Sequence, residues 1–363
     1  MDIYVLGSKY EVLSIMDVYN SLIWADRYNT AGDFELYTSL AGAIPEGIAI
    51  GNYISTKDSK RFMIIESLEI SSSIDEGPTL KTTGRSLESI LMRRVVAKYT
   101  SISGSIQNGI QKILNENVIN PSLEDRKIPG FTFKKSDDPV VVAAEIDTYF
   151  LGETVYDAIV TMCQYADLGF HVLPDGEGGF VFELYSGVDY SYAQEERPWV
   201  VFSPEYNNLL SSNYYTSPMN MKTVGLVGGP GEDWERPLAW TTGPYKAGSG
   251  LDRRETFIEA TGIATEYENP NTGERVPYSK AQIERFLQND GRIAMYDYLN
   301  AEAFEGEADV SQQFHYGTDF DLGDIVQVEN EFGLQQSCRV TEIVISDDSG
   351  GYIITPTFVG VEN

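Results

Sequence analysis

The sequence has 363 residues, enough for two or three domains with buried cores. Acidic residues outnumber basic ones by 55 to 26, and the resulting net charge of −29 disfavours binding to nucleic acid or to an anionic membrane surface. Because 42% of the residues are hydrophobic, this acidity belongs to a folded protein rather than to a disordered one.

Membrane-spanning and secretory segments are not expected. The longest apolar runs resemble VVVAA at 140–144, far short of the roughly 18 residues that span a bilayer. The first 15 residues lack a basic region followed by an apolar stretch, so no secretory signal is predicted. We interpret Cys163 and Cys338 as reduced, buried thiols, which places folding in a cytoplasm.

Residues 1–96 are predicted to form a β-domain of short strands. Such strands at regular spacing indicate a sandwich or a barrel. Within them, WADRYNTAGDFELYTS at 24–39 predicts an antiparallel hairpin, with its turn near Gly32. Leu87, Ile90 and Leu91 then indicate a helix within 84–96. The predicted strands are 2–6, 11–16, 21–28, 33–38, 50–55, 62–73 and 79–84.

Residues 97–190 are predicted to form a small α+β insertion. It comprises a helix at 105–118, an irregular segment at 121–152, a helix within 153–170 and a hairpin at 170–184. The second helix carries an apolar stripe that includes Cys163.

Residues 191–363 return to predicted strands and are interpreted as a second β-domain. One helix is expected within them, from Ser279 to about Asn300, with Gln282 completing a capping box and Gly291 as a candidate interruption.

The segments 50–84 and 322–360 share an order of features that predicts duplication. Each opens with a glycine and a short polar residue, Gly51-Asn52 or Gly323-Asp324, followed by strand, polar turn, strand, turn and final strand. The second strands align Glu66 with Glu342. We therefore expect two similar β-domains separated by the insertion.

No pattern of residues indicates catalysis, a metal or a cofactor. His171 and His315 lie in predicted strands and are interpreted as structural. The glycine-rich run 225–234 lacks the G-K-[ST] ending of a phosphate loop and is predicted to be a loop between strands. Asp319, Asp321 and Asp324 lie close together, but Gly323 stands where a calcium loop needs an oxygen ligand. Carboxylate pairs that would suit a glycosidase are expected by chance among 55 acids.

Several motifs resemble, in order, a family of tail-hub proteins of long-tailed bacteriophages. They are WADRY, GDFEL, GNYI and TGRSLESILMRR, followed by FELYSGVDYS at 182–191, VVFSPEYNNLLSSNY at 200–214, VGLVGGPGEDWERP at 224–237 and DFDLGDIVQV at 319–328.

This resemblance implies a non-enzymatic homotrimer in the tail tip of a virion, assembled in the host cytoplasm. Each subunit would contribute two tube-like antiparallel β-barrel domains to a pseudo-sixfold ring. Implied partners are the distal tail tube protein, the tape measure protein and other baseplate or tail-fibre proteins, and DNA would pass without specific binding. A C-terminal peptidase or fibre extension is not expected, since the sequence ends soon after its last predicted strand.

Two alternatives stay open. One is the hub of a phage-derived contractile or injection machine. The other is a carbohydrate-binding or wall-degrading tail protein, for which Trp234 and Trp240 are candidate sugar-binding residues. On the hub interpretation, the hairpin at 24–39 serves assembly, with Trp24, Arg27 and Tyr28 determining its packing.

Overall fold

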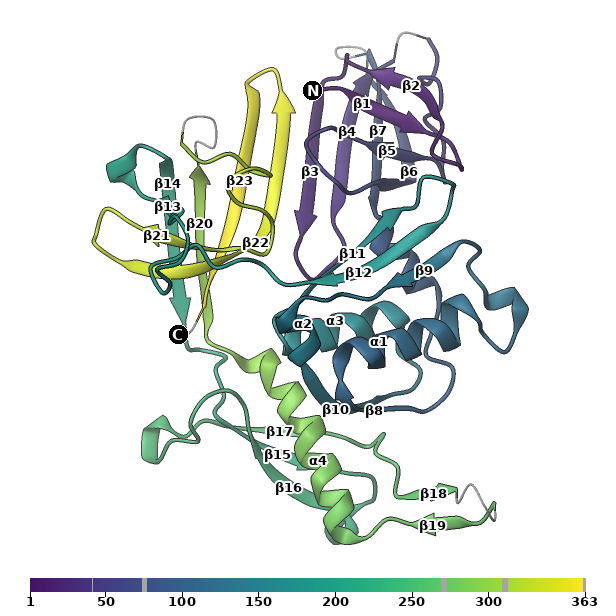
Figure 1. The fold of residues 1–363 in the computed structure, drawn as a ribbon, viewed down its shortest axis with the longest axis vertical. Helices are drawn as coiled ribbons and strands as arrows, with labels where there is room; N and C mark the ends of the chain where they lie inside the picture. The colour runs from purple at the N-terminus through teal and green to yellow at the C-terminus, as the bar shows by residue number, and fades with distance from the viewer. Residues whose placement is uncertain (41, 74–76, 269–272, 309–312, 362–363) are drawn as a thin grey trace.

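The computed structural model describes the whole chain except residues 41, 74–76, 269–272, 309–312 and 362–363. Strands dominate it, as predicted, and the chain builds one large sheet, an α+β insertion and a smaller α+β unit (Figure 1).

The large sheet has 13 strands and combines both ends of the chain. Its order is β14-β20-β23-β22-β3-β4-β7-β6-β5-β1-β2, with β21 beside β22 and β13 beside β21. The N-terminal strands are β1 (Ile3–Leu6), β2 (Val12–Met16), β3 (Ser21–Arg27), β4 (Asp33–Ser39), β5 (Tyr53–Ser55), β6 (Met63–Ser73) and β7 (Gly77–Ser86). The C-terminal strands are β13 (Val201–Phe202), β14 (Leu209–Ser217), β20 (Ala301–Ala308), β21 (Ile325–Glu329), β22 (Gln335–Asp348) and β23 (Gly351–Gly360).

The two halves of this sheet are continuous, whereas two separate barrels were expected. Strands β22 and β3 pair antiparallel and join them, and among the described strands the sheet stays open. A single core covers one face of both halves and includes Trp24, Phe34, Ile345 and Phe358. Alternation positions these side chains: along β4, Phe34 and Leu36 are buried while Glu35 and Tyr37 are partly exposed.

The insertion packs three helices against short strands. Its elements are β8 (Thr100–Ser105), α1 (Ile106–Leu114), β9 (Phe131–Lys134), α2 (Pro139–Ala143), β10 (Glu145–Phe150), α3 (Val155–Tyr165), β11 (Gly169–Pro174) and β12 (Phe180–Tyr185). The apolar stripe of α3 is buried, as predicted. The prediction of an irregular segment at 121–152 is wrong, because it contains β9, α2 and β10. Strand β9 has only four residues and pairs with β12, about 50 residues later, so its own sequence gives little signal.

Short helical turns connect these elements. They are η1 (Leu87–Arg93), the π-helical η2 (Asn115–Ile119), η3 (Glu124–Arg126), η4 (Pro204–Tyr206), η5 (Asp233–Glu235), η6 (Gly250–Asp252) and η7 (Met295–Tyr298). The helix expected within 84–96 is the 3₁₀ helix η1, which buries Leu87, Ile90 and Leu91 as predicted. It also buries Glu88, which an amphipathic α-helix would have left in water.

The smaller unit consists of β15 (Val224–Gly228), β16 (Leu238–Thr242), β17 (Glu255–Glu259), β18 (Glu266–Glu268), β19 (Arg275–Pro277) and α4 (Lys280–Ala294). Helix α4 packs on the three-stranded sheet β16-β15-β17, away from the large sheet (Figure 1). The Ser279–Gln282 capping box is present. Gly291 does not interrupt the helix. A Cβ there would lie 2.3 Å from Val227 Cγ2, so glycine allows close helix-to-sheet packing.

Both cysteines are buried, as predicted, in different cores: Cys163 in that of the insertion and Cys338 in that of the large sheet. Burial raises the pKa of the Cys163 thiol. In the described part of the chain, no helix combines the length and apolarity that crossing a bilayer requires.

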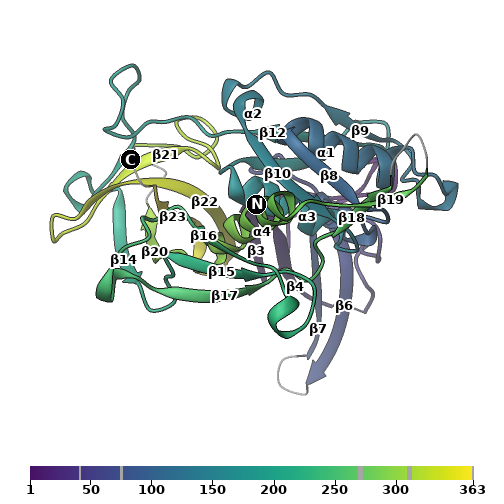
Figure 2. The same ribbon diagram turned by 90° about the horizontal axis from the view of Figure 1, so that it is seen from below.

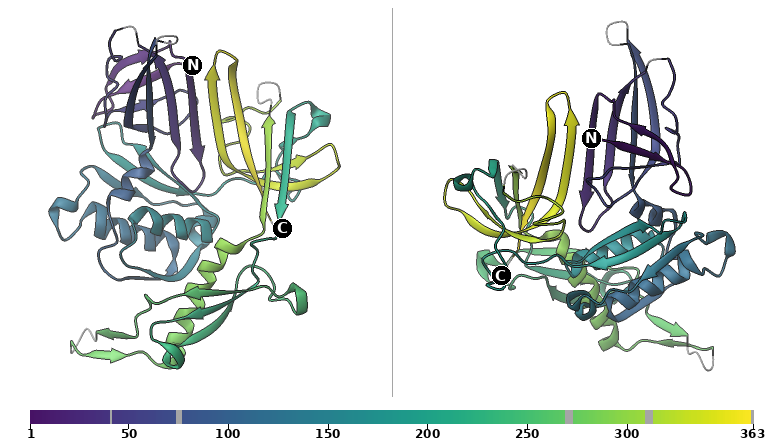
Figure 3. Two further views of the ribbon diagram at one scale, coloured as in Figure 1. Left: turned by 180° about the vertical axis from the view of Figure 1, so that it is seen from behind. Right: turned by 45° about the horizontal axis from the view of Figure 1, so that its top comes forward.

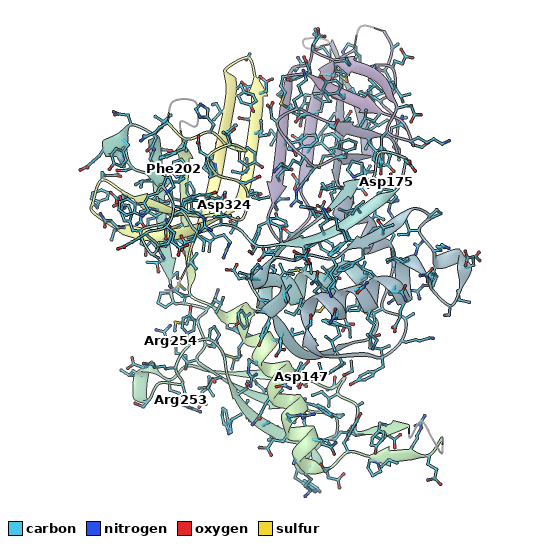
Figure 4. The ribbon with its side chains drawn as sticks, viewed as in Figure 1. Asp147, Asp175, Phe202, Arg253, Arg254 and Asp324 are labelled. Atoms are coloured by element: carbon cyan, nitrogen blue, oxygen red, sulfur yellow. The ribbon has the colours of Figure 1, made fainter. Side chains whose placement is uncertain are left out.

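Helix α4 also contacts the insertion, through polar groups. The Asn289 amide donates to Asp147 Oδ2 at 2.8 Å (Figure 4). The next residue, Asp290, is mostly buried, and this burial, together with the Glu153 carboxylate, raises its pKa to about 6.

We expect Asp290→Asn to stabilise the protein by about 2 kcal/mol at pH 7 and to have little effect near pH 4. The pKa of Asp290 rises from an ordinary 3.8 to about 6 on folding, so the native state holds a proton that the unfolded chain releases. The contribution of Asp290 to stability is therefore largest below pH 4, falls as the pH rises to 6, and is constant above. Urea unfolding from pH 4 to 8 tests this, with the exposed Asp252→Asn as control. Parallel profiles for wild type and Asp290→Asn would contradict it.

Candidate assembly interface

The junction between the two halves of the large sheet is built by β3 and β22. They pair antiparallel from Arg27↔Glu342 to Ser21↔Asp348, and the Tyr28 N–H extends the ladder to the Thr341 carbonyl at 3.0 Å. Strands from opposite ends of the chain therefore lie side by side (Figure 3). The two halves of the sheet therefore join through main-chain hydrogen bonds between edge strands.

Charged groups hold both ends of the junction. At one end, Arg27 Nε lies 2.6 Å from Glu342 Oε1, and its Nη1 bonds Asp33 and the Ala31 carbonyl. At the other end, the amino group of Met1 lies 2.7 Å from Asp347 Oδ2. These pairs are partly exposed, so they contribute more to the register of the strands than to stability.

The turn of the 24–39 hairpin contacts the insertion as well. The Tyr28 hydroxyl donates to the Asp167 carbonyl at 3.0 Å, and the Ala31 N–H donates to the Tyr156 hydroxyl at 2.8 Å. The Arg339 guanidinium lies 5.2 Å from the centre of the Tyr28 ring. This stretch therefore ties both halves of the sheet to the insertion, and the buried Trp24 and Tyr28 have the packing role expected of them.

A buried ion pair lies beneath the turn. Arg61 Nη1 is 2.8 Å from Glu88 Oε1, and the two side chains are 5% and 0% exposed. Arg61 also donates to the Arg27 carbonyl at 2.6 Å, and Glu88 accepts from the Val172 N–H at 3.1 Å. Burial raises the pKa of the adjacent Asp26, which accepts from Ser59 and Trp24. Local sequence patterns do not predict this cluster, and its one signal is the charged Glu88 among the apolar residues of η1.

The two segments predicted to be duplicated have the same strand order in the structure. Strands β5-β6-β7 and β21-β22-β23 are antiparallel meanders in the same order. Ile65 pairs with Gly84 as Val340 pairs with Phe358, and each pair precedes a bulge. The bulge corrects the expected alignment by one residue: Glu66 corresponds to Thr341, and Ser67 to Glu342.

The equivalence extends beyond these strands. The Gly51 N–H bonds the Ile65 carbonyl, and the Gly323 N–H bonds the Val340 carbonyl, with φ of 91° and 97° at the two glycines. In the neighbouring strands, β4 and β20 both pair with the last strand of their meander, and β3 and β14 follow outward. Their facing aromatic pairs match: Trp24 with Phe34, and Tyr214 with Phe304. Thus β3 corresponds to β14.

The residues considered for chemistry have structural partners. His171 Nε2 lies 3.2 Å from Glu183 Oε2, and burial lowers the pKa of its imidazole. His315 contacts Asp319, whereas Asp324 accepts the Val188 and Asp321 N–H groups, each at 2.7 Å. In the described ranges, no three His, Cys, Asp or Glu residues are grouped so that they could hold a metal.

The glycine-rich run and the two candidate tryptophans lie in the smaller unit. Residues 225–228 belong to β15 rather than to a loop, and the rest of the run connects β15 to β16. Trp234 is 89% exposed. The guanidinium carbon of Arg253 lies over the Trp240 ring, 5.3 Å from the ring centre. They project from different elements, and nothing in their geometry forms a shared sugar platform.

A cavity of about 620 Å³ opens beside the junction, lined by Asp26, Arg61, His171, Tyr316 and Asp321 among others. Two pairs of opposite charges already engage groups of its lining: Arg61 with Glu88, and Asp321 with Lys60. The exposed strand edges of the large sheet, rather than this cavity, are therefore the main candidate for a binding surface.

Comparisons with known proteins identify a family for this chain and solved structures with a similar fold. A family model described as Siphovirus ReqiPepy6 Gp37-like protein matches residues 2–358. The fold resembles that of a tail protein from Neisseria meningitidis MC58, at 14% identity and a TM-score of 0.57, covering 99% of this chain and 95% of that one. It also resembles the prophage MuSo2 43 kDa tail protein from Shewanella oneidensis, at 11% identity and a TM-score of 0.58, covering 99% and 98%. Prophage tail protein gp18 from Listeria monocytogenes EGD-e is similar at 11% identity and a TM-score of 0.54, covering 100% and 95%. A search of curated proteins finds no match.

Proposed function

Because the chain belongs to the Siphovirus ReqiPepy6 Gp37-like protein family, as the resemblance of its motifs to phage tail proteins indicated, we propose that it is a structural hub of a phage tail tip or baseplate. Three copies form a pseudo-sixfold ring that joins the tail tube to the tip. In this proposal residues 1–96 and 191–363 form the tube-like domains, the second without the smaller unit at 224–294, and 97–190 form the insertion between them.

The observation that carries this proposal is the repeated half-sheet. Both halves have the same strand order, the same bulge and the same glycine contact, and they are joined side by side rather than face to face. Three such chains present six similar units, which suits a sixfold partner such as a tail tube. The proposed partners are the distal tail tube protein, the tape measure protein and the baseplate or fibre proteins, in a virion assembled in the host cytoplasm.

We also propose that DNA passes through the ring without specific binding. The net charge of −29 supports this, because a phosphate backbone gains nothing from approaching an acidic wall. On the sheet face opposite the core, several charges are paired, including Glu35 with Lys81 and Glu66 with Arg85. That face therefore offers DNA few uncompensated cations.

Light scattering on the purified protein should give about three times the 40.4 kDa chain mass, at high concentration if partner proteins are needed for full assembly. We expect this mass because the two joined halves have outer edges that face away from each other, so that neighbouring chains can continue the sheet and three of them can close the proposed ring. A protein that stays monomeric across the concentration range, or that forms a twofold dimer, would contradict the ring.

The proposed role is non-enzymatic, so the protein should clear no zone in zymograms against several peptidoglycan preparations. This assay separates the proposed structural role from the enzymatic alternative, a tail protein that degrades the cell wall. A lysozyme lane controls for the substrate. Clearing that disappears when one Asp or Glu is replaced would refute the structural role.

A further inference from the structure

Two strands of the large sheet, β6 and β14, each have an edge without a described partner strand. The equivalent edges in the other half of the repeat, those of β22 and β3, pair with each other. In β22, residues 342–348 lie between β23 and β3. The corresponding residues of β6, 67–73, pair with β7 on one side, and no described strand adjoins their other side. Strand β14, the counterpart of β3, is the outermost strand at the opposite end of the sheet (Figures 1 and 2).

Side chains on the two unpaired edges are exposed where the equivalent side chains at the β3–β22 junction are buried. Ile345 of β22 is fully buried opposite Trp24, whereas its counterpart Ile70 in β6 is 55% exposed. Ala25 of β3 is 3% exposed, whereas its counterpart Tyr215 in β14 is 54% exposed. Both edges therefore show apolar groups in water at positions that are covered at the junction within the chain.

We propose that β14 of one subunit pairs antiparallel with residues 67–73 of β6 in the next, repeating the β3–β22 junction between chains. Transferring the register of that junction gives Ser67↔Ser217, Leu68↔Thr216 and Glu69↔Tyr215. Ile70 then faces Tyr214, as Ile345 faces Trp24. This inference rests on the proposed function, because it specifies which surfaces close the ring.

The chemistry of the edges suits such pairing. The edge contact is heterologous, so each subunit uses both edges and the assembly closes without leaving one uncovered. Strand β14, LLSSNYYTS, has no charged residue, and residues 67–73 contain only Glu69. In a chain with a net charge of −29, these edges can approach without strong like-charge repulsion.

Disulfide trapping tests the register. Glu69→Cys combined with Tyr215→Cys should give covalent three-chain rings on mild oxidation. Glu69→Cys with Thr216→Cys, shifted by one residue and facing the other side of the sheet, should give at least tenfold less. Ala25→Cys with Val344→Cys, the counterpart pair within one chain, should cross-link without any increase in mass. Mixing the two single variants should trap mixed dimers; dimers of one single variant alone would overturn the head-to-tail pairing.

A second variant separates this inference from the hub proposal. Ile70→Lys should convert a three-chain particle to a single folded chain with an unchanged unfolding transition. Leu251→Lys, a control at an exposed residue of η6 in the smaller unit, should stay trimeric. If Ile70→Lys remains trimeric and Glu69→Cys/Tyr215→Cys does not cross-link, the edge pairing is wrong and the hub proposal stands. If the wild type is monomeric and never cross-links, both are wrong.

Discussion

Replacing Arg61 with methionine is expected to lower the free energy of unfolding by about 3–5 kcal/mol at pH 7, among the largest effects of any single change in this protein. The substitution keeps most of the side-chain volume but leaves the fully buried Glu88 carboxylate without its cation. It also removes the hydrogen bond to the Arg27 carbonyl, at the point where both halves of the sheet and the insertion meet. Urea unfolding followed by tryptophan fluorescence measures the loss.

Two controls distinguish the buried ion pair from charge in general. Lys60→Met removes the neighbouring but exposed partner of Asp321, and it should cost less than about 1 kcal/mol. The double variant Arg61→Met/Glu88→Gln should recover part of the loss, because neither member is then left charged and buried. An Arg61→Met protein within 1 kcal/mol of the wild type would show that water or other groups replace the guanidinium.

The loss in Arg61→Met should also shrink as the pH falls toward 4. Burial raises the pKa of Asp26, whose carboxylate is stabilised by the nearby Arg61. Once Asp26 is protonated it no longer needs a cation, so the variant loses less at low pH than at pH 7. The same titrations at pH 4 and 7 provide this comparison.

Gly323→Ala should destabilise the protein clearly more than Gly51→Ala, although the two glycines occupy equivalent places in the repeat. Both have positive φ, so alanine costs about 1–2 kcal/mol at either site. At Gly323 a Cβ would also lie 2.3 Å from the Tyr28 ring, whereas at Gly51 it meets nothing within 4 Å. We expect about 1–3 kcal/mol more for Gly323→Ala from this overlap.

Thermal and urea unfolding of the two variants, measured side by side, test this difference. Because backbone strain is matched, the excess loss reports only the packing of Tyr28 between the second half of the sheet and the insertion. Equal losses would mean that the Tyr28 ring moves aside without cost, and that the turn of the hairpin is less tightly held than its contacts indicate.

Local patterns in the sequence were sufficient wherever a segment's neighbours are close along the chain. Alternation in DFELYTS predicted β4 to within one residue, and the apolar stripe of α3 and the capping box of α4 predicted those helices. The shared order of glycine, strand, turn and strand predicted the repeat, since each meander is built from consecutive strands. Periodicity and turn chemistry act over a few residues, and these elements need nothing more.

Only the tertiary structure decided how these pieces join. The pairing of β3 with β22 brings together residues 315 apart, as between Arg27 and Glu342, and main-chain hydrogen bonds carry no side-chain code that selects one edge over another. The bulge at Thr341 likewise shifted the alignment of the repeat, because the extra residue is defined by its partner strand and not by its own sequence. Arg61 and Glu88 became an ion pair only because packing excluded water from both. Long-range pairing and burial are properties of the folded chain, so this sequence specified its strands and helices locally, and the folded structure alone determined which edges were paired and which stayed exposed.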